Sequence, residues 1–373
     1  MIQKKIDWTA SFFIIGYHLF FFIAAPIALF TCAPAASMLW ISLALVFVTG
    51  ISVTALYHRL YSHLCYKTNP IVEAIFLFFA SAATQGSALR WAYDHRLHHA
   101  FVDTEKDPYS IKKGFWHAHV LWMFFHIDEI DPKVVSDLLR NKLLVLQHKY
   151  YGLCMVISNT AIFLTLGWAF QDYWNAFVFG WLGRTFLLHH TTWFINSLAH
   201  TWGSRHYSEE HSAADNYFLC LLTYGEGYHN YHHTFAQDYR NGIRWYHFDP
   251  TKWLIWTLYK LGLARDLKRV NDFRIAKQLI SFHKEKLISY LQGSLNLGIE
   301  KKVVEIGDLL IDRLGQLQAL YEKCRAIPKA EAKLLQEQIK AYRKEWKTNW
   351  KSWKKLIRVV NLLGLHDQPS PAQ

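Results

Sequence analysis

Residues 38–63 read MLWISLALVFVTGISVTALYHRLYSH, an apolar run that passes directly into a polar segment with two histidines. The apolar part, Met38–Leu56, is long enough to cross a bilayer, because a spanning helix needs about 20 apolar residues. Two later segments also contain clustered histidines, HRLHH at 95–99 and HNYHH at 229–233. Histidines gathered in this way beside apolar stretches indicate a metal site at the edge of a membrane.

The composition supports a membrane protein with a charged appendage. The chain has 373 residues, 52% of them hydrophobic, yet its mean hydropathy is only +0.01, so apolar and charged segments must be segregated, with the charge concentrated in the last hundred residues. Its five cysteines are far apart and form no CxxC pair, which argues against a disulfide framework and a thiolate zinc site. The net charge of +12 suits a membrane surface, an acidic electron carrier or a phosphate-bearing substrate, and no nucleic acid partner is expected.

Four stretches have the length and composition of membrane spans: Ser11–Phe30, Met38–Leu56, Leu153–Phe170 and Tyr173–Ile195. A fifth, Ile71–Ala88, is apolar only at its start. If it crossed the membrane, the first two histidine segments would face opposite compartments and could not share a metal centre. We therefore expect it to lie along the interface or to enter and return. The alternative is that it crosses and that one histidine segment lies outside the site.

The distribution of Lys and Arg predicts the orientation. These residues crowd the N-terminus, the segment 59–149 and everything after residue 205, whereas the turns 31–37 and 171–172 contain none. The positive-inside rule then places both termini and all histidine segments in the cytoplasm, at a bacterial inner membrane or, in a eukaryote, the endoplasmic reticulum. The predicted fold class is all-α and multi-pass, with four transmembrane helices and a helical cytosolic cap that holds the histidine site.

Helical spacing explains how the histidines can converge. Residues three and four apart share a face of a helix, which applies to two of the histidine segments. His58 and His63 are five apart, so we expect them at a frayed helix end that bends them together. One ion takes four to six ligands, so nine imidazoles predict two ions, and nine neutral ligands fit two redox irons better than zinc. The predicted ligands are His58, His63, His95, His98, His99, His200, His229, His232 and His233.

Other polar residues lie close to these ligands in the sequence. Asn196 precedes His200 by one helical turn and could hold a metal-bound water. Asp94 and Glu226 could orient imidazole N–H groups, or they could be solvated acids in loops. His189 and His190 lie within an apolar stretch, where they could line a cavity. The remaining histidines, for example His119, lack the spacing and are expected at the surface or the membrane interface.

The motifs HRLYSH (58–63), DHRLHH (94–99), NSLAH (196–200) and GEGYHNYHHTF (225–235) resemble those of the membrane fatty acid desaturases, in particular the acyl-CoA, stearoyl-CoA-type branch acting at carbon nine. The resemblance runs from about Ser11 to Lys268. It implies two irons held by the nine histidines, with a water on the Asn, and O₂ as co-substrate. It also implies an external ferredoxin- or cytochrome-type electron donor with its reductase, because no cofactor signature for nicotinamide, flavin or haem is evident here.

The resemblance also suggests where the substrate lies. In the family, a Gln, a Trp and a Thr form the bend of the acyl tunnel, and they match Gln85, Trp91 and Thr192. From the sequence itself, Val46 and Gly50 lie on one face of the second span and could form the far end of the tunnel, or could simply pack one helix on another.

The sequence does not identify the group that carries the acyl chain. This chain has Tyr93 where relatives have Arg, and it has no basic pair around Phe125 and His126 to match the one that many animal members place near the CoA nucleotide. An acyl-CoA, an acyl-lipid or an acyl chain on a carrier protein is therefore a possible substrate.

Two domains are predicted, a membrane desaturase domain with its cap at 1–270 and a charged helical extension at 271–373. The extension should form amphipathic helices at Phe273–Gln292, Glu300–Cys324 and Lys329–Val360. The last of these interleaves Lys and Arg with three Trp on one face. That face could pack on a partner helix, rest on an anionic membrane or dock an electron donor.

Three functions compete at the level of sequence. The first is an oxygen-dependent acyl desaturase that introduces a cis double bond. The second is a di-iron membrane hydroxylase of fatty acids or alkanes, which differs by returning one oxygen to its substrate. The third is a non-enzymatic metal-binding membrane protein, which should place its histidines within the spans as a pathway.

Overall fold

The computed structural model describes residues 5–125, 128–291, 297–328 and 331–362. The chain divides into two compact units, a membrane unit of residues 1–205 and 209–269 and a C-terminal unit of residues 206–208 and 270–373. The predicted mostly helical fold is confirmed, because the two strands of the described residues are only two residues long each: β1 (Lys67–Thr68) pairs antiparallel with β2 (Ala264–Arg265).

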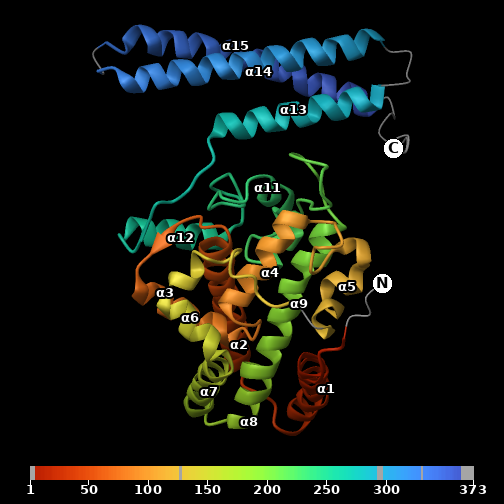
Figure 1. The fold of residues 1–373 in the computed structure, drawn as a ribbon, viewed down its shortest axis with the longest axis vertical. Coiled ribbons are helices and arrows are strands. Elements are labelled where there is room, and N and C mark those ends of the chain that lie inside the picture. The colour runs from red at the N-terminus through yellow and green to blue at the C-terminus, as the bar shows by residue number, and fades with distance from the viewer. Residues whose placement is uncertain (1–4, 126–127, 292–296, 329–330, 363–373) are drawn as a thin grey trace. The chain divides into compact units, whose positions relative to one another are not determined.

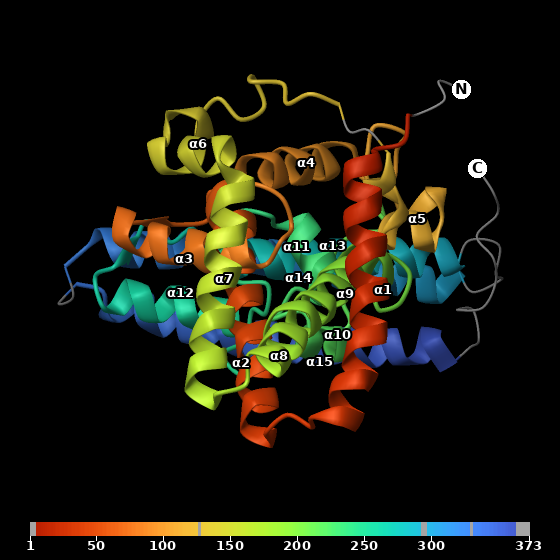
Figure 2. The same ribbon diagram turned by 90° about the horizontal axis from the view of Figure 1, so that it is seen from below.

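Three helices of the membrane unit are long and apolar enough to cross a membrane: α1 (Trp8–Thr31), α2 with its continuation (Ala36–Ser62) and α7 (Tyr151–Phe170). The fourth predicted span, Tyr173–Ile195, is a continuous helical path built from α8 (Tyr173–Asn175), the π-helix η5 (Ala176–Gly183) and α9 (Arg184–Ser197). The other three helices pack around this path (Figures 1 and 2).

A buried arginine explains why the fourth path tolerates a charge. Arg184 donates to the carbonyl oxygens of Gly180 and Ala82, at 2.9 and 3.0 Å, and to the side-chain oxygen of Asn159. Its guanidinium is therefore buried inside the bundle with polar partners, the arrangement expected of a cation in an apolar stretch.

The fifth apolar stretch forms a short helix, α3 (Pro70–Ala82). Asn69 caps it by accepting from the N–H groups of Ile71 and Val72, and Pro70 occupies the first turn, where its missing N–H costs nothing. At 13 residues the helix is about 20 Å long, shorter than the roughly 30 Å hydrocarbon core. Its length is that of an interfacial or re-entrant segment.

The α2 helix continues without a break into a π-helix, η1 (Val53–Ser62). Its signature is the bond from the His63 N–H to the His58 carbonyl at 3.1 Å, which joins residues five apart. The expected frayed helix end is thus wrong. The wider π-helical turn brings His58 and His63 onto one face, with ring centroids 4.8 Å apart.

The remaining helices of the membrane unit are short and form the cap. The largest is α4, which Ser87 caps by accepting from the Arg90 N–H. They are α4 (Ala88–Phe101), η2 (Ile111–Lys113), α5 (Phe115–His119), η3 (Leu121–Phe124), η4 (Leu138–Arg140), α6 (Lys142–Lys149), η6 (Leu198–His200), α10 (Tyr217–Leu222), α11 (His229–Thr234) and α12 (Pro250–Lys260).

The C-terminal unit consists of three helices with their own core: α13 (Asp272–Leu291), α14 (Leu297–Ala326) and α15 (Lys333–Leu362). They lie where the sequence predicts amphipathic helices, with α14 packed on both of the others (Figure 1). Trp353 is completely buried among residues such as Ile280 and Leu310.

Candidate metal centre

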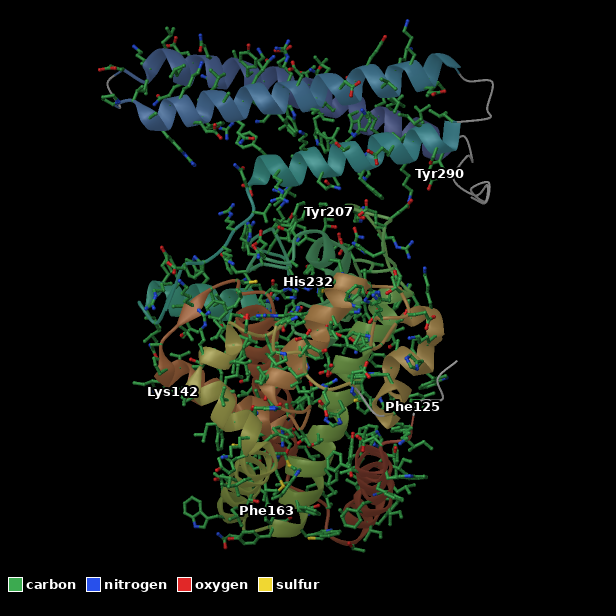
Figure 3. The ribbon with its side chains drawn as sticks, viewed as in Figure 1. Phe125, Lys142, Phe163, Tyr207, His232 and Tyr290 are labelled. Atoms are coloured by element: carbon green, nitrogen blue, oxygen red, sulfur yellow. The ribbon has the colours of Figure 1, made fainter. Side chains whose placement is uncertain are left out.

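All nine predicted histidine ligands come together in the cap. His58 and His63 belong to η1 and its C-terminal cap, three histidines project from α4, His200 ends η6, and three project from α11. Figure 3 shows His232 at the end of the membrane unit opposite Phe163 of α7. The histidines thus converge at one end of the bundle rather than along its spans.

The imidazoles form two separate groups. Within each group, one nitrogen from every residue lies within 4.8 Å of the others. The first group comprises His58, His63, His95, His99 and His232, and the second comprises His98, His200, His229 and His233.

The nitrogens that converge are the Nε2 atoms. In the first group the Nε2 atoms of His63 and His95 are 2.9 Å apart, and those of His58 and His232 are 3.0 Å apart. In the second group the Nε2 atoms of His200 and His229 are 3.0 Å apart. Each group therefore presents a focus of nitrogen lone pairs, which is the donor set that a divalent transition metal requires.

Burial disfavours the protonated form of ligands in both groups. It lowers the pKa of His95, His99 and His63 well below the usual imidazole value, with smaller contributions from neighbouring imidazoles and, for His63, from two arginines. The same holds in the second group for His229 and His233, where burial is again the largest cause. Neutral imidazole is the form that binds metals, so no proton has to be displaced at neutral pH.

A buried carboxylate, that of Glu226, contacts the first histidine group on the side away from the converging nitrogens. The Nδ1 atom of His58 lies 3.0 Å from Oε2 of Glu226, which also accepts from Asn241 at 2.6 Å. Arg59 binds Glu226 at 2.9 Å and Asp249 through two contacts of 2.9 and 3.2 Å. Burial by itself would raise the pKa of Glu226, but His58 and Arg59 outweigh it and lower that pKa to about 2. The carboxylate is therefore ionised and fixes the outward ring nitrogen of His58.

Three further side chains orient ligands and were not foreseen from the sequence. Nδ1 of His98 lies 3.0 Å from Oδ1 of Asp107, and Nδ1 of His95 lies 3.2 Å from the Tyr109 hydroxyl. Nδ1 of His200 lies 2.7 Å from Oγ of Ser212, which in turn donates to Asp103 at 2.6 Å. An N–H at each Nδ1 leaves Nε2 free for a metal. Asp107 and Tyr109 belong to an Asp-Pro-Tyr segment soon after the second histidine motif, a signal that could have suggested them.

Asp94 does not have the contact predicted for it. Its carboxylate accepts from Arg90 at 2.9 and 2.7 Å, and among the described residues no imidazole of the two groups bonds to it. Burial raises its pKa to about 6 although Arg90 opposes this. The reason is geometric, because Asp94 and Arg90 are four apart on α4 and so face each other. Asp107, from the following loop, reaches the histidine instead.

A cavity of about 510 Å³ meets the first group of histidines. Its walls include His58, His95 and Asn196, together with the predicted bend residues Gln85, Trp91 and Thr192. The size lies in the range of about 300 to 1,000 Å³ that ligand pockets occupy. The chain thus has a cavity that reaches the candidate metal centre.

The bend residues contact one another and the ligands. Nε2 of Gln85 donates to the Thr192 hydroxyl at 2.9 Å, while its Oε1 is buried without a protein partner. Trp91 stacks on His95 with ring centroids 4.9 Å apart. An aromatic plane and a fixed amide therefore form the cavity wall beside the first metal group.

At the predicted far end of the acyl tunnel, the structure places a residue that the sequence did not suggest. Gly50 lines the cavity, and a Cβ built on it would lie 2.2 Å from the ring of Tyr224. Tyr224 also lines the cavity, and its hydroxyl donates to the Val46 carbonyl at 3.3 Å. Val46 is buried but is absent from the cavity wall. The bulky residue at this wall is Tyr224, which sequence reasoning missed.

Four other histidines, His18, His119, His189 and His190, gather outside the metal groups. His189 lines the cavity, and its Nδ1 accepts from the Tyr17 hydroxyl at 2.7 Å. His190 bonds instead to His18 and His119, both at 3.1 Å. His119 is buried, so its predicted surface position is wrong; packing of α5 against α9 covers it.

Residues 34–267 match the family model "Fatty acid desaturase", which is more than half of the chain. The chain belongs to the fatty acid desaturase family. The matched segment contains both histidine groups and the cavity residues Gln85, Trp91 and Thr192, and it ends before α13.

Several proteins named as desaturases are similar to this chain. The "Probable acyl-CoA desaturase" of Schizosaccharomyces pombe is 38% identical over 270 residues, 70% of this chain and 56% of the relative. "Acyl-CoA desaturase 1" of Saccharomyces cerevisiae is 36% identical over 257 residues, 67% of this chain and 50% of the relative. The "sn-1 stearoyl-lipid 9-desaturase" of Anabaena variabilis is 29% identical over 271 residues, 71% of this chain and 95% of the relative. The chain thus spans about half the length of the first two relatives.

Proposed function

We propose that this protein is an O₂-dependent acyl-chain desaturase with two iron ions, one in each histidine group. The observation that carries the proposal is the cavity of about 510 Å³ that reaches His58, His95 and His229, which are members of both groups. Iron bound there would supply the oxidising power to remove hydrogen from an unactivated methylene. The overall change is –CH₂–CH₂– + O₂ + 2e⁻ + 2H⁺ → –CH=CH– + 2H₂O.

The protein's own residues would position the chain and keep water away. Trp91, fixed by its stack on His95, and the Gln85–Thr192 pair would hold the reacting methylenes beside the first group. Asn196 lies on the same wall, and we propose that its side chain holds a water at the metals. Glu226, Asp107 and the other groups behind the imidazoles would keep the rings aligned through each turnover.

The membrane arrangement that fits best has four crossings, α1, α2, α7 and the η5–α9 path. If α3 also crossed, His63 and His95 would lie on opposite sides of the bilayer, whereas their Nε2 atoms are 2.9 Å apart. By the positive-inside rule the termini and the metal centre face the cytoplasm. The membrane would be the inner membrane of a bacterium or the endoplasmic reticulum of a eukaryote.

The substrate and the electron source complete the proposal. The relatives include two acyl-CoA desaturases and a stearoyl-lipid 9-desaturase, so we propose a long-chain acyl-CoA or acyl-lipid, with a cis double bond at carbon nine. The two electrons would come from a ferredoxin- or cytochrome-type carrier with its reductase. Membrane lipid is the other expected contact.

Expression of the full chain in a cell that lacks monounsaturated fatty acids, followed by mass analysis of the fatty acids, tests this proposal. Wild type should yield monounsaturated products two hydrogens lighter than their precursors. His232→Ala should insert into the membrane but yield none, because it removes a ligand of the first group. A product heavier by one oxygen would instead identify a hydroxylase. Stoichiometric metal uptake without O₂ consumption, in the presence of a donor system, would indicate a metal-binding protein.

A further inference from the structure

The α15 helix carries a continuous basic face. Between Lys333 and Leu362 it has seven lysines and two arginines, and all nine are exposed. At 100° per residue they fall within a sector of about 120°. We define these residues as the basic face: Lys333, Lys340, Arg343, Lys344, Lys347, Lys351, Lys354, Lys355 and Arg358.

A neighbouring side of the same helix packs into the core of the C-terminal unit. Trp353 is completely buried, and Trp346 and Trp350 pack against the core while stacking on each other with centroids 5.3 Å apart. The tryptophans therefore cannot anchor this helix in a bilayer while the unit is folded. Any surface that binds α15 must bind the cations.

Within this sector of α15 the one acidic residue is Glu337, against nine cations. In the described part of the chain no carboxylate pairs with its seven lysines, and Glu345 of α15 pairs with Arg313 of α14 at 3.0 Å. Like charges four apart, such as Lys347 and Lys351, repel each other and weaken an isolated helix. Arg343 lies over the ring of Tyr321 of α14, 5.4 Å from its centroid, whereas the seven lysines of the basic face are exposed. An external anion would relieve the repulsion.

The length of the basic face and its residue types indicate which kind of anion it binds. From Lys333 to Arg358 the helix rises about 38 Å, and cations recur on successive turns from Lys340 to Arg358, so a flat surface can meet several turns at once. Lysine, which binds as a point charge, outnumbers arginine, which suits fixed bidentate recognition. We propose that the basic face docks on the anionic lipid headgroups of the membrane that holds the membrane unit. This rests on the membrane placement proposed above, and the covalent link to that unit keeps the bilayer at high effective concentration.

Lysine footprinting of the full-length protein tests this docking. The protein is reconstituted in nanodiscs of phosphatidylcholine alone or of phosphatidylcholine with phosphatidylglycerol, and acetylated with an uncharged reagent. Mass spectrometry then gives the rate at each lysine. In the anionic discs the lysines of the basic face should react about fivefold more slowly, while exposed Lys301, Lys302 and Lys323 of α14 keep their rates. High salt should remove the protection.

Two matched variants separate the basic face from general charge. The triple variant Lys347→Glu, Lys351→Glu and Lys354→Glu should remove the protection of Lys340 and Lys344. The triple variant Lys301→Glu, Lys302→Glu and Lys323→Glu changes the charge equally and should leave it. Equal rates in both kinds of disc, or equal loss in both variants, would overturn the proposal. Protection by an acidic carrier protein in neutral discs, with none from anionic lipid, would overturn it in favour of a protein partner. Because no readout uses activity, failure here is distinct from failure of the desaturase proposal.

Discussion

Glu226→Gln should weaken iron binding at the first histidine group without unfolding the protein. The carboxylate lies against three donors, from His58, Arg59 and Asn241, at 3.0, 2.9 and 2.6 Å. A glutamine loses the charge and turns an N–H₂ group toward at least one of those donors. Loss of a partner that orients a ligand typically lowers metal affinity 10- to 100-fold, which is about 1.4 to 2.8 kcal/mol.

The cost in folding stability should be smaller than for a fully broken ion pair. Removing one partner of a buried pair costs about 3 to 5 kcal/mol when the other charge is left alone. Arg59 keeps two contacts with Asp249, at 2.9 and 3.2 Å, and one with the Tyr239 carbonyl at 2.7 Å. We therefore expect folded, membrane-inserted Glu226→Gln protein.

The assay is iron content by elemental analysis after equilibration with graded concentrations of a chelator. Asp107→Asn should behave like Glu226→Gln, because Asp107 orients His98 of the second group. Asp94→Asn is the control, since Asp94 is also buried but pairs with Arg90. Retention of iron by Glu226→Gln equal to that of wild type and Asp94→Asn would refute the role given to this carboxylate.

Three further outcomes follow from the geometry. Tyr224→Leu should shift the products toward longer acyl chains, because the ring of Tyr224 fills the wall against Gly50; an unchanged product profile would remove Tyr224 from the substrate path. Gln85→Leu, which breaks the 2.9 Å bond to Thr192, should spread the double bond over neighbouring positions, whereas a single unchanged position would show that the pair does not align the chain. The metal-free protein should lose stability as the pH falls below about 6.5. Burial lowers the pKa of seven of the nine imidazoles in the folded protein. Below that pH the unfolded chain therefore binds more protons than the folded chain, which favours unfolding. An unfolding temperature that does not fall between pH 7.5 and 5.5 would contradict this.

Helical spacing predicted part of the convergence, since the i, i+3, i+4 pattern of His95, His98 and His99 fixes one face of α4. The five-residue spacing of His58 and His63 predicted convergence for the wrong reason. A π-helix, not a frayed end, aligns them, and no local propensity rule distinguishes a π-helix from the α-helix that it continues.

The partners behind the ligands were less predictable, because they depend on how distant loops pack. Asp94 is adjacent to His95 in sequence, yet its carboxylate is held by Arg90. Ser212 reaches His200 from a loop that Asp103, 109 residues away, holds in place. Tyr224 likewise meets Gly50 across 174 positions of the chain. Contacts of this range are decided by tertiary packing and leave no periodic signal.

We propose that the two histidine groups hold two irons beside the cavity that receives the acyl chain. Elemental analysis of the purified, active, full-length protein, combined with Mössbauer spectroscopy of the ⁵⁷Fe-enriched form, tests it most directly. We predict two irons per chain in nitrogen-rich sites, and loss of iron from the first group in His232→Ala. Active protein with zinc, or with at most one iron per chain, would contradict the account.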